Sequence, residues 1–439
     1  MSGIAQLFLG RGFKVSGSDL KETRITEALK KSGAEVFIGH DVKNIEGADI
    51  VVYSSAIKED NPEIIATKQL GLPLLKRAEA LAELMKGRMS IAVTGSHGKT
   101  TTASLVAYLL LEAGLKPTVA IGGILKNIDT NASLGEGDFF VAEADESDGS
   151  FLYYEPKYSI ITNIDHEHLD YYRNFSNVLS AFGEFMAKTQ DGGCIFAGSD
   201  DANLKNILSG YKKKYVLFGL EEGAHIYPSK IEIEGLSSTF DCYYRDKFIE
   251  RFYLALGGRH NISNSLAAIA LGLELGIDVE VIKKALANYK GAGRRIEIKL
   301  KDKDYLIIDD YAHHPTEIKA TLGAVKNLNP GRVIAIFQPH RYTRTQLLLD
   351  EFGKSFAAAD YVVVTDIYPA SETPIKGITA KLVYDKIRAN FPDKQIYYLP
   401  KEKITEHILA NIKPGDLVIT LGAGDIIKTN DELVERLKR

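Results

Sequence analysis

The sequence contains no tryptophan and only two cysteines, Cys194 and Cys242, among its 439 residues. Two cysteines so far apart do not have the spacing of a zinc site, and we expect them to be free thiols in a reducing compartment. The chain also lacks an apolar run of membrane-spanning length, and no signal-peptide pattern opens it. We therefore expect a cytoplasmic protein that does not insert into membranes.

Neither sign of charge dominates the chain. The net charge of −4 at pH 7 lacks the basic excess of a nucleic-acid binder, and we expect no nucleic-acid partner. A content of 45% hydrophobic and 26% charged residues is typical of a globular protein. A chain of 439 residues is too long for one core, which predicts two or three domains. A monomer and a homodimer both remain open.

The clearest chemical signal is the string T-G-S-H-G-K-T-T at residues 94–101. A short apolar run at residues 91–93 predicts a buried strand before it, and residues 103–111 predict a helix after it. Strand, glycine-rich turn and helix are the context of a phosphate-binding loop, although only two residues separate Gly95 from Gly98 here. The alternative is an ordinary turn between a strand and a helix.

The chemistry of such a loop depends on its backbone and on two side chains. The amides of residues 95–101 would surround a phosphate at the start of the helix, where the helix dipole adds positive charge. Lys99 can reach the outer phosphates, and the hydroxyl of Thr100 can bind Mg²⁺. The predicted nucleotide site therefore comprises Gly95, Ser96, His97, Gly98, Lys99, Thr100 and Thr101.

Two further strands are followed by groups that bind metals. The apolar run at residues 139–141 leads into E-A-D-E-S-D, in which Glu143 is the first carboxylate beyond the strand and the expected Mg²⁺ ligand. The alternative to a metal site is that this acidic segment forms a solvated turn. A second buried strand is predicted at residues 158–165, and it precedes His166 and His168. Surface histidines are the usual alternative.

Residues 1–86 alternate between strand-like and helix-like segments, which predicts a parallel sheet. A helix is expected at residues 4–9, and strands at residues 13–16, 35–38 and 49–53. Asp19 follows the first of these strands, where an acidic residue meets a ribose hydroxyl in some nucleotide-binding folds. The alternative for Asp19 is a helix-capping role.

The last third of the chain has the same alternation. Strands are predicted at residues 305–310, 333–337, 361–365 and 416–421, and a helix after Pro315. The second strand leads to His340, Arg341 and Arg344, three cationic or potentially cationic groups within five residues. Because arginine pairs bidentately with carboxylates and phosphates, this cluster predicts an anion clamp.

Six ordered motifs resemble those of the Mur ligase family. They are T-G-S-H-G-K-T-T, E-A-D-E-S-D, H-L-D, H-N-x-x-N, D-D-Y-A-H-H-P and P-H-R-Y-T-R, and they span essentially the whole chain. The resemblance implies an α/β fold of three domains, each built on a mainly parallel sheet. These are a Rossmann-like UDP-sugar domain at 1–88, a central ATP-binding domain at 89–295 and a Rossmann-like amino-acid domain at 296–439.

The resemblance also implies the reaction. The family uses ATP and Mg²⁺, and the alanine-adding branch joins L-alanine to UDP-N-acetylmuramate through an acyl phosphate. Domains that carry parts of one site imply closure, hinged near Arg295. Two alternatives are a recycling ligase that attaches a murein peptide to the same sugar, and a degenerate relative that binds nucleotide without catalysis.

The resemblance assigns further residues by their place in the motifs. His168 would hold a second Mg²⁺, and Asn261 and Asn264 would read adenine, although a helix cap also suits Asn261. The implied catalytic residues are Lys99, His168, His314, His340, Arg341 and Arg344. The implied ATP contacts beyond the loop are His260, Asn261, Asn264, Arg295 and Asp310. The implied substrate contacts are Ser18, Asp19, Ser54, Ser55 and Tyr311, together with both arginines of the clamp.

The start of the chain departs from this pattern. A Rossmann-like domain should open with a strand and a glycine-rich turn, whereas residues 4–9 here already read as the helix that follows them. We expect the first sheet to lack a central strand, the natural reading frame to extend upstream of Met1, and this form to bind the UDP-sugar weakly.

Overall fold

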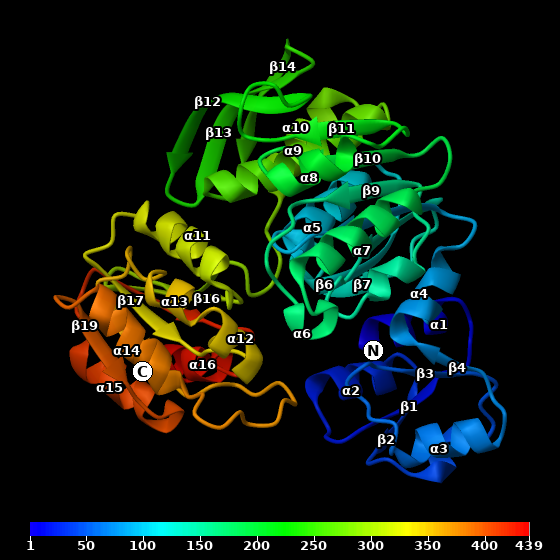
Figure 1. Ribbon diagram of the computed structural model, residues 1–439, viewed down its shortest axis with the longest axis horizontal. Coiled ribbons are helices and arrows are strands. Elements are labelled where there is room, and N and C mark those ends of the chain that lie inside the picture. Colours follow the sequence, from blue (N-terminus) through cyan, green and yellow to red (C-terminus); the bar gives the residue numbers. More distant parts are fainter. Residues whose placement is uncertain (439) are drawn as a thin grey trace. The chain divides into compact units, whose positions relative to one another are not determined.

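The computed structural model describes residues 1–438, and for Asp170 it describes the backbone but not the side chain (Figure 1). The aspartate side chain of the H-L-D motif therefore lies outside the described residues. The chain forms two compact units. Unit 1 contains residues 1–229, 241–252 and 263–291, and unit 2 contains residues 230–240, 253–262 and 292–438. Within residues 1–438, no helix is both long enough and apolar enough to cross a bilayer.

The first part of unit 1 alternates short strands with helices, as the sequence predicts. The chain opens with helix α1 (Ser2–Gly10), in agreement with the predicted helix. The later elements are β1 (Ser16–Asp19), α2 (Arg24–Lys31), β2 (Glu35–Ile38), η1 (Val42–Ile45), β3 (Val51–Tyr53), α3 (Pro62–Gln69), β4 (Leu74–Lys76) and α4 (Arg77–Met85). The pairings β1–β2 and β3–β4 are parallel, but they form two separate two-stranded sheets. The predicted strand at residues 13–16 is wrong by three residues, because pairing with β2 begins only at Ser16.

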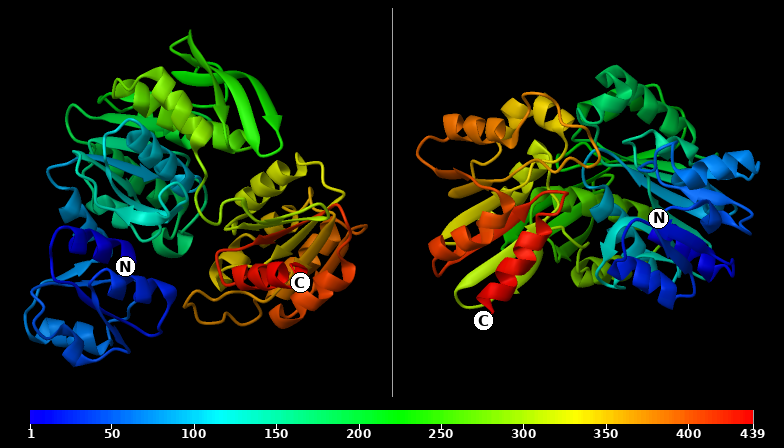
Figure 2. Two further views of the ribbon diagram at one scale, coloured as in Figure 1. Left: turned by 180° about the vertical axis from the view of Figure 1, so that it is seen from behind. Right: turned by 90° about the horizontal axis from the view of Figure 1, so that it is seen from below.

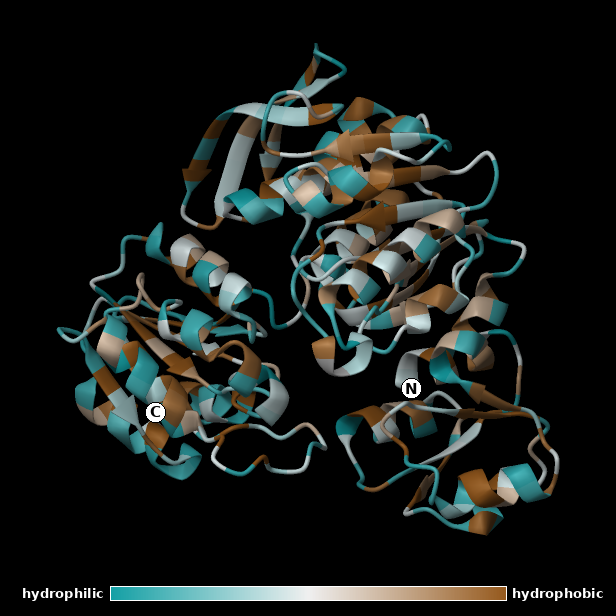
Figure 3. Cartoon of the chain, viewed as in Figure 1, coloured by the Kyte–Doolittle hydropathy of each residue, from teal (hydrophilic) through white to brown (hydrophobic). Residues whose placement is uncertain are grey.

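A ten-stranded sheet follows in the order β14-β13-β12-β11-β10-β9-β5-β8-β6-β7. Its strands are β5 (Met89–Thr94), β6 (Thr118–Leu125), β7 (Thr130–Ser133), β8 (Phe139–Glu143), β9 (Tyr158–Ile161), β10 (Cys194–Gly198), β11 (Tyr215–Phe218), β12 (Ile226–Glu234), β13 (Ser237–Tyr244) and β14 (Lys247–Leu254). The central pairings of β5 with β8 and β9 are parallel. These strands are mostly apolar and almost continuously buried, as expected where helices cover both faces of a sheet (Figure 3).

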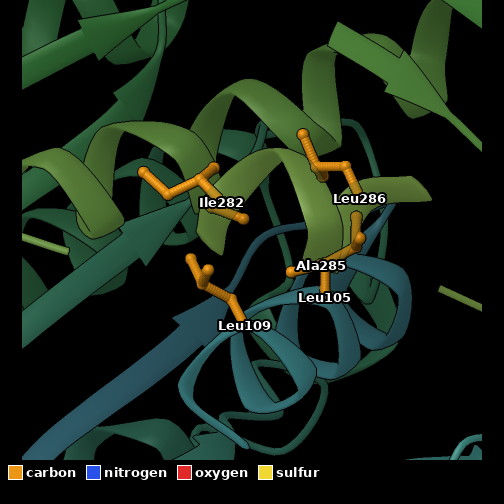
Figure 4. A pocket seen from close by; sticks show the side chains of 6 residues that line it. Leu105, Leu109, Ile282, Ala285 and Leu286 are labelled. Carbon is orange, nitrogen blue, oxygen red and sulfur yellow. The ribbon is translucent and has the colours of Figure 1, made fainter. Parts of the chain in front are cut away.

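Helix α5 (Lys99–Glu112) carries the predicted phosphate loop at its start. Nearly every side chain of its first three turns is buried, so the helix is enclosed rather than amphipathic. Its far side packs against α10 (Val279–Asn288), where Leu105 and Leu109 face Ile282, Ala285 and Leu286 (Figure 4). Burial of this kind fixes the helix and thereby the loop. The other helices are η2 (Ser150–Tyr153), α6 (Leu169–Tyr172), α7 (Phe175–Ala187), α8 (Ala202–Leu208) and α9 (Arg259–Glu274).

Unit 2 is built on a six-stranded sheet with the order β15-β16-β20-β17-β18-β19. The strands are β15 (Glu297–Lys301), β16 (Tyr305–Asp310), β17 (Arg332–Phe337), β18 (Tyr361–Val364), β19 (Gln395–Tyr398) and β20 (Asp416–Leu421). Only β15 is antiparallel to its neighbour. The helices are α11 (Pro315–Lys326), α12 (Tyr342–Leu347), α13 (Leu349–Gly353), α14 (Ala380–Asn390), η3 (Lys401–Lys403), α15 (Ile404–Asn411) and α16 (Ile427–Leu437).

The helices of unit 2 cover both faces of this sheet (Figure 2). One apolar cluster joins the sheet to α11, α13 and α14, and a second joins its other face to α15 and α16. The four strands predicted from the sequence in this region are confirmed to within one residue, and so is the helix after Pro315. Parallel strands covered on both faces place their carboxyl ends, and the side chains that follow them, at one edge of the sheet.

Candidate active site

The loop between β5 and α5 requires both of its glycines. Gly95 has a φ of +128°, and a Cβ there would lie 2.1 Å from Thr162 Oγ1. Gly98 has a φ of +81°, and its Cβ would lie 2.5 Å from Asn264 Oδ1. A side chain at either position would therefore be strained and would collide with a neighbour. The sequence predicted this glycine-bracketed turn, and its backbone geometry is that of a tight loop leading into a helix.

The segment after β9 holds the loop from the outside. The Ser96 amide donates to Asn163 O and the His97 amide to Asn163 Oδ1, both at 2.9 Å. The Thr162 hydroxyl donates to His97 O at 2.6 Å. The prediction that all amides of residues 95–101 face an anion is therefore wrong for Ser96 and His97. The amides that remain suited to a phosphate are those of the first turn of α5, which have no partner within a helix.

This bracing also explains why β9 is short. The sequence predicted a strand through Asp165, whereas β9 ends at Ile161. The Thr162 amide still donates to Thr94 O at the end of β5, but the Thr162 hydroxyl and the Asn163 side chain donate to His97 O of the loop. Asp165 continues the pattern, since its amide donates to Ser96 Oγ at 2.8 Å and its carboxylate lies 3.0 Å from His97 Nε2. Sequence reasoning missed Asn163 and Asp165 as loop-bracing residues, because the apolar run before them hides the end of the strand.

Lys99 lies back over the loop. Its Nζ donates to Gly95 O at 2.6 Å, to Ser96 O at 3.2 Å and to Glu146 Oε1 at 2.8 Å. Burial alone would lower the pKa of Lys99, but the carboxylates of Glu146 and Asp145 outweigh burial and raise it. The ammonium group is therefore charged and sits where it can exchange carbonyl partners for phosphate oxygens.

Thr100 and Glu143 meet as the sequence predicts. The Thr100 hydroxyl donates to Glu143 Oε1 at 2.9 Å, and the Gly122 amide donates to Glu143 Oε2 at 2.7 Å. Burial raises the pKa of Glu143, against the opposing effect of Lys99. A hydroxyl and a buried carboxylate at the start of α5 are oxygen donors of the kind that Mg²⁺ prefers.

His168 does not join Glu143 but lies in a separate acidic group. Its Nε2 is 3.4 Å from Glu146 Oε1 and 3.4 Å from Glu167 Oε2. Burial would lower the pKa of His168, but these two carboxylates raise it to about 9. Ligand atoms of Glu146, Glu167 and His168 lie within 4.8 Å of one another, so the three can hold one cation.

Glu146 is the functional candidate that sequence reasoning missed. It is 1% exposed and bonds Lys99, while its Oε2 is buried with no hydrogen-bond partner among the described residues. An orphaned carboxylate oxygen next to a histidine fits a divalent cation. The sequence does place Glu146 in the acidic motif E-A-D-E-S-D, as its second glutamate. The direction in which its side chain points could not be predicted from the sequence.

The H-N-x-x-N motif lies on α9. Asn264 sits against Gly98 of the loop, as the nucleotide-site assignment requires. Asn261 donates from Nδ2 to Gly257 O at 2.8 Å, and since α9 begins at Arg259, Asn261 is not the helix cap that the sequence allowed. Burial, helped by Arg295, lowers the pKa of His260 to about 4, so this imidazole is neutral near pH 7.

In unit 2, the arginine pair at the predicted hinge has two different roles. Arg294 donates to Asp309 Oδ2 at 2.8 Å and to Gly422 O at 2.7 Å, which ties it into the sheet. Arg295 pairs with Glu317 at 3.4 Å, and its guanidinium lies 5.3 Å from the ring centre of Tyr311. Arg294 lies at a similar distance from the same ring, 5.2 Å, and the two side chains are similarly exposed, at 22% for Arg294 and 27% for Arg295. The assignment of Arg295 to ATP stays a prediction.

Asp310 organises the same turn from inside. Its Oδ2 accepts from the Ile296 amide at 2.6 Å and its Oδ1 from the Ala312 amide at 2.8 Å. Burial raises the pKa of Asp310 to about 6, although Arg295 opposes this. The side chain is 2% exposed. Its two hydrogen bonds to backbone amides hold the neighbouring backbone in place.

The predicted anion clamp forms a cluster with two histidines. Arg344 Nη1 is 3.3 Å from His340 Nδ1, and the His340 ring lies 5.4 Å from that of His313. Burial and these cationic neighbours lower the pKa of His340 to about 3, so it is neutral and can accept a hydrogen bond. His314 instead caps α11, where its Nδ1 accepts from the Thr316 amide at 3.3 Å. Sequence reasoning named His314 and missed His313.

The four substrate residues predicted in the first domain differ in their hydrogen bonds and in their exposure. Ser18 donates to Glu63 Oε2 at 2.8 Å and lies 3.0 Å from His40 Nδ1. Asp19 accepts from the Lys21 amide at 3.2 Å, so the helix-capping alternative is wrong, and Thr23 caps α2 instead. Ser54 accepts from the Ala56 amide at 3.3 Å, and Ser55 is exposed.

Comparison with family models gives three consecutive matches. Residues 1–89 match the Mur ligase family catalytic domain, residues 93–272 the Mur ligase middle domain, and residues 294–424 the Mur ligase glutamate ligase domain. Together these matches cover most of the chain.

The chain is similar over its full length to curated proteins named UDP-N-acetylmuramate–L-alanine ligase. It is 44% identical to the one from Geotalea daltonii over 438 residues, covering 100% of this chain and 96% of that protein. It is 47% identical to the one from Persephonella marina over 440 residues, covering 100% and 95%.

Solved structures of two kinds of ligase resemble the whole chain. UDP-N-acetylmuramate-alanine ligase from Thermotoga maritima superposes with a TM-score of 0.85 at 30% identity, covering 100% of this chain and 96% of that one. A murein peptide ligase from Psychrobacter arcticus gives a TM-score of 0.73 at 25% identity, again covering 100% and 96%. Both scores are high, and the first is the higher in score and in identity.

Proposed function

The chain belongs to the Mur ligase family, and we propose which of its residues perform each part of the family reaction. It is an ATP-dependent ligase that joins L-alanine to the carboxylate of UDP-N-acetylmuramate in peptidoglycan synthesis. The observation that carries this conclusion is the full-length match to alanine-adding ligases at 44–47% identity.

The phosphate loop serves the first chemical step. A carboxylate is a poor acylating agent, so its oxygen first attacks the γ-phosphate of ATP and gives an acyl phosphate with release of ADP. Lys99, already charged and beside the loop, is proposed to offset the charge that builds on the transferring phosphoryl group. The first-turn amides of α5 would hold the neighbouring phosphates.

Magnesium fits two sets of side chains. Thr100 and Glu143 provide one pair of oxygen donors, as predicted from the sequence. Glu146, Glu167 and His168 provide a second set, and the orphaned Glu146 oxygen supports it. When bound, Mg²⁺ would neutralise charge on phosphate oxygens. We therefore assign Glu146 and Glu167 alongside His168, in addition to the ligands proposed from the sequence.

The amino-acid substrate is assigned to unit 2. Arg341 and Arg344 follow β17 and are proposed to bind the carboxylate of L-alanine, for which the guanidinium fork is suited. Because Arg344 Nη1 donates to Nδ1 of neutral His340, the other ring nitrogen, Nε2, carries the proton, and we propose that His340 orients Arg344 for the substrate. The amine of L-alanine attacks the carbonyl carbon of the acyl phosphate and expels phosphate. His314 remains a proposed contributor, as do His260, Asn261, Asn264 and Arg295 for ATP.

The UDP-sugar is assigned to the first domain, where Ser18 and Asp19 end β1 and Ser54 and Ser55 follow β3. We also propose a cytoplasmic location, since the reaction consumes ATP and a nucleotide-linked sugar. A monomer or a homodimer is proposed, and light scattering of the purified protein decides between them.

The proposal is tested by omitting one substrate at a time. We expect phosphate release from ATP only when UDP-N-acetylmuramate, L-alanine and Mg²⁺ are all present, with the amide product seen by mass spectrometry. Release with a murein tripeptide in preference to L-alanine would identify a recycling ligase. ATP binding without release under any combination would identify a non-catalytic relative.

A further inference from the structure

Helix α12 carries one arginine of the proposed alanine site, and the other immediately precedes it. Arg344 lies within α12 (Tyr342–Leu347), and Arg341 is its N-cap residue with a φ of +69°. A left-handed φ at a non-glycine residue is strained, so surrounding contacts must stabilise this turn. A helix this short has few bonds of its own with which to do so.

A carboxylate from another part of the chain stabilises the turn. Glu372 Oε2 accepts from the Tyr342 amide at 2.7 Å and from the Thr343 amide at 3.1 Å. Glu372 Oε1 accepts from the Thr343 hydroxyl at 2.6 Å. Both carboxylate oxygens are therefore used at the start of α12. Hydrogen bonds from backbone amides to a carboxylate are charge-assisted and stronger than neutral ones.

The loop that contains Glu372 is itself arranged to present this side chain. It runs between β18 and α14 over residues 365–379, and it is joined to the arginine turn where Arg341 N donates to Tyr368 O at 2.9 Å. Ala370 and Ser371 both have positive φ values, and they turn the chain immediately before Glu372. Glu372 is half-buried, whereas residues 371, 373 and 374 are exposed.

We propose that Glu372 is a positioning residue for the amino-acid substrate. It fixes the backbone of residues 341–343, so that Arg341 and Arg344 project from one rigid turn, and it contacts the substrate only through them. The inference rests on the proposed function, in which these arginines bind the carboxylate of L-alanine. Its structural part, the restraint of the turn by Glu372, does not depend on any substrate.

Steady-state kinetics tests the functional part. For Glu372→Ala we expect the KM for L-alanine to rise about tenfold or more, with the KM values for ATP and the UDP-sugar and the kcat at saturating alanine changed by less than about threefold. Glu372→Gln keeps one acceptor oxygen, so its KM for L-alanine should lie between that of Glu372→Ala and that of the wild type. Lys376→Ala, an exposed change in the same loop, is the matched control and should behave as the wild type. An unchanged alanine KM, or equal losses for all three substrates, would overturn the proposal.

Hydrogen exchange without any substrate tests the structural part separately. The amides of Tyr342 and Thr343 should exchange about tenfold faster in Glu372→Ala than in the wild type or in Lys376→Ala, with the central strands unchanged. Unaltered exchange would overturn the restraint itself. A wild-type enzyme that does not use alanine would instead refute the proposed function, while the exchange result would still decide whether Glu372 holds the turn.

Discussion

At the residue scale, one buried carboxylate connects the main parts of the proposed ATP site. Glu146 lies 2.8 Å from Lys99 Nζ and 3.4 Å from His168 Nε2. It offsets the charge of the loop lysine and stands among the proposed metal ligands. A single side chain therefore couples the stability of the phosphate loop to its chemistry.

We predict that Lys99→Met lowers both turnover and stability. Loss of the ammonium should reduce kcat about a hundredfold or more, and it leaves the charge of Glu146 buried without its partner, which costs about 3 kcal/mol. The double variant with Glu146→Gln should recover most of the stability but none of the activity. Kinetics and denaturant unfolding of the single and double variants measure these effects, and a single variant that retains wild-type turnover would remove Lys99 from the mechanism.

Asp310 should give the stability a measurable pH dependence. Burial raises its pKa from 3.8 to about 6, so folding favours the protonated form. This contribution is complete below about pH 3.8 and is lost as the pH rises through about 6. Relative to Asp310→Asn, the free energy of unfolding of the wild type should fall by about 2 kcal/mol from about pH 4 to about pH 8. Parallel curves for the two proteins would contradict this account.

The two clamp arginines should affect one substrate more than another. In Arg341→Ala and Arg344→Ala, we expect the KM for L-alanine to rise by about tenfold or more while the affinity for ATP changes little, because the lost guanidinium pairs with a carboxylate. Separate titrations of ATP and alanine make the comparison. A loss for ATP alone would place these arginines on the nucleotide.

The sequence could predict the site residues that are placed by their position in a strand–loop–helix pattern. Lys99 and Thr100 open the helix that follows β5, Glu143 ends β8, and the structure brings Thr100 and Glu143 to within hydrogen-bonding distance. Glu146 and Glu372 could not be assigned in this way. Their roles depend on side-chain direction and on contacts across 47 residues in one case and about 30 in the other.

At the element scale, the phosphate loop is a turn held from both sides. Asn163 bonds its outer backbone, and Asn264 of α9 packs against Gly98. The glycine pattern predicted the turn, and the apolar runs predicted β5 and α5. The end of β9 was predicted four residues too late, because periodicity does not show that the side chains of Thr162 and Asn163 bond to the loop.

Gly98→Ala separates backbone strain from steric collision. Its φ of +81° resembles the +71° of Gly114 at the other end of α5, but only Gly98 has a neighbour in the way of a Cβ. Both substitutions should cost roughly 1 kcal/mol of stability through φ alone. Only Gly98→Ala should also raise the KM for ATP, by about tenfold or more, since Asn264 or the loop must move. Equal ATP kinetics in the two variants would contradict the assigned packing.

At the scale of the whole molecule, three α/β regions were predicted with boundaries at residues 88 and 295. The family models match residues 1–89, 93–272 and 294–424, whereas the contacts within the chain define two compact units. The three-part division stays a prediction. The parallel sheets were predictable from alternating apolar runs, but the separation of β1–β2 from β3–β4 depends on pairing that periodicity does not encode.

The central claim is that the sugar carboxylate is phosphorylated before alanine attacks it. The most direct measurement uses UDP-N-acetylmuramate labelled with ¹⁸O in that carboxylate and follows the phosphate released by the wild-type enzyme in the presence of ATP and L-alanine. The account predicts one ¹⁸O atom in each phosphate from fully labelled substrate, because the oxygen that attacks the γ-phosphate leaves with it when the amide forms. Unlabelled phosphate, formed together with the amide product, would contradict the account.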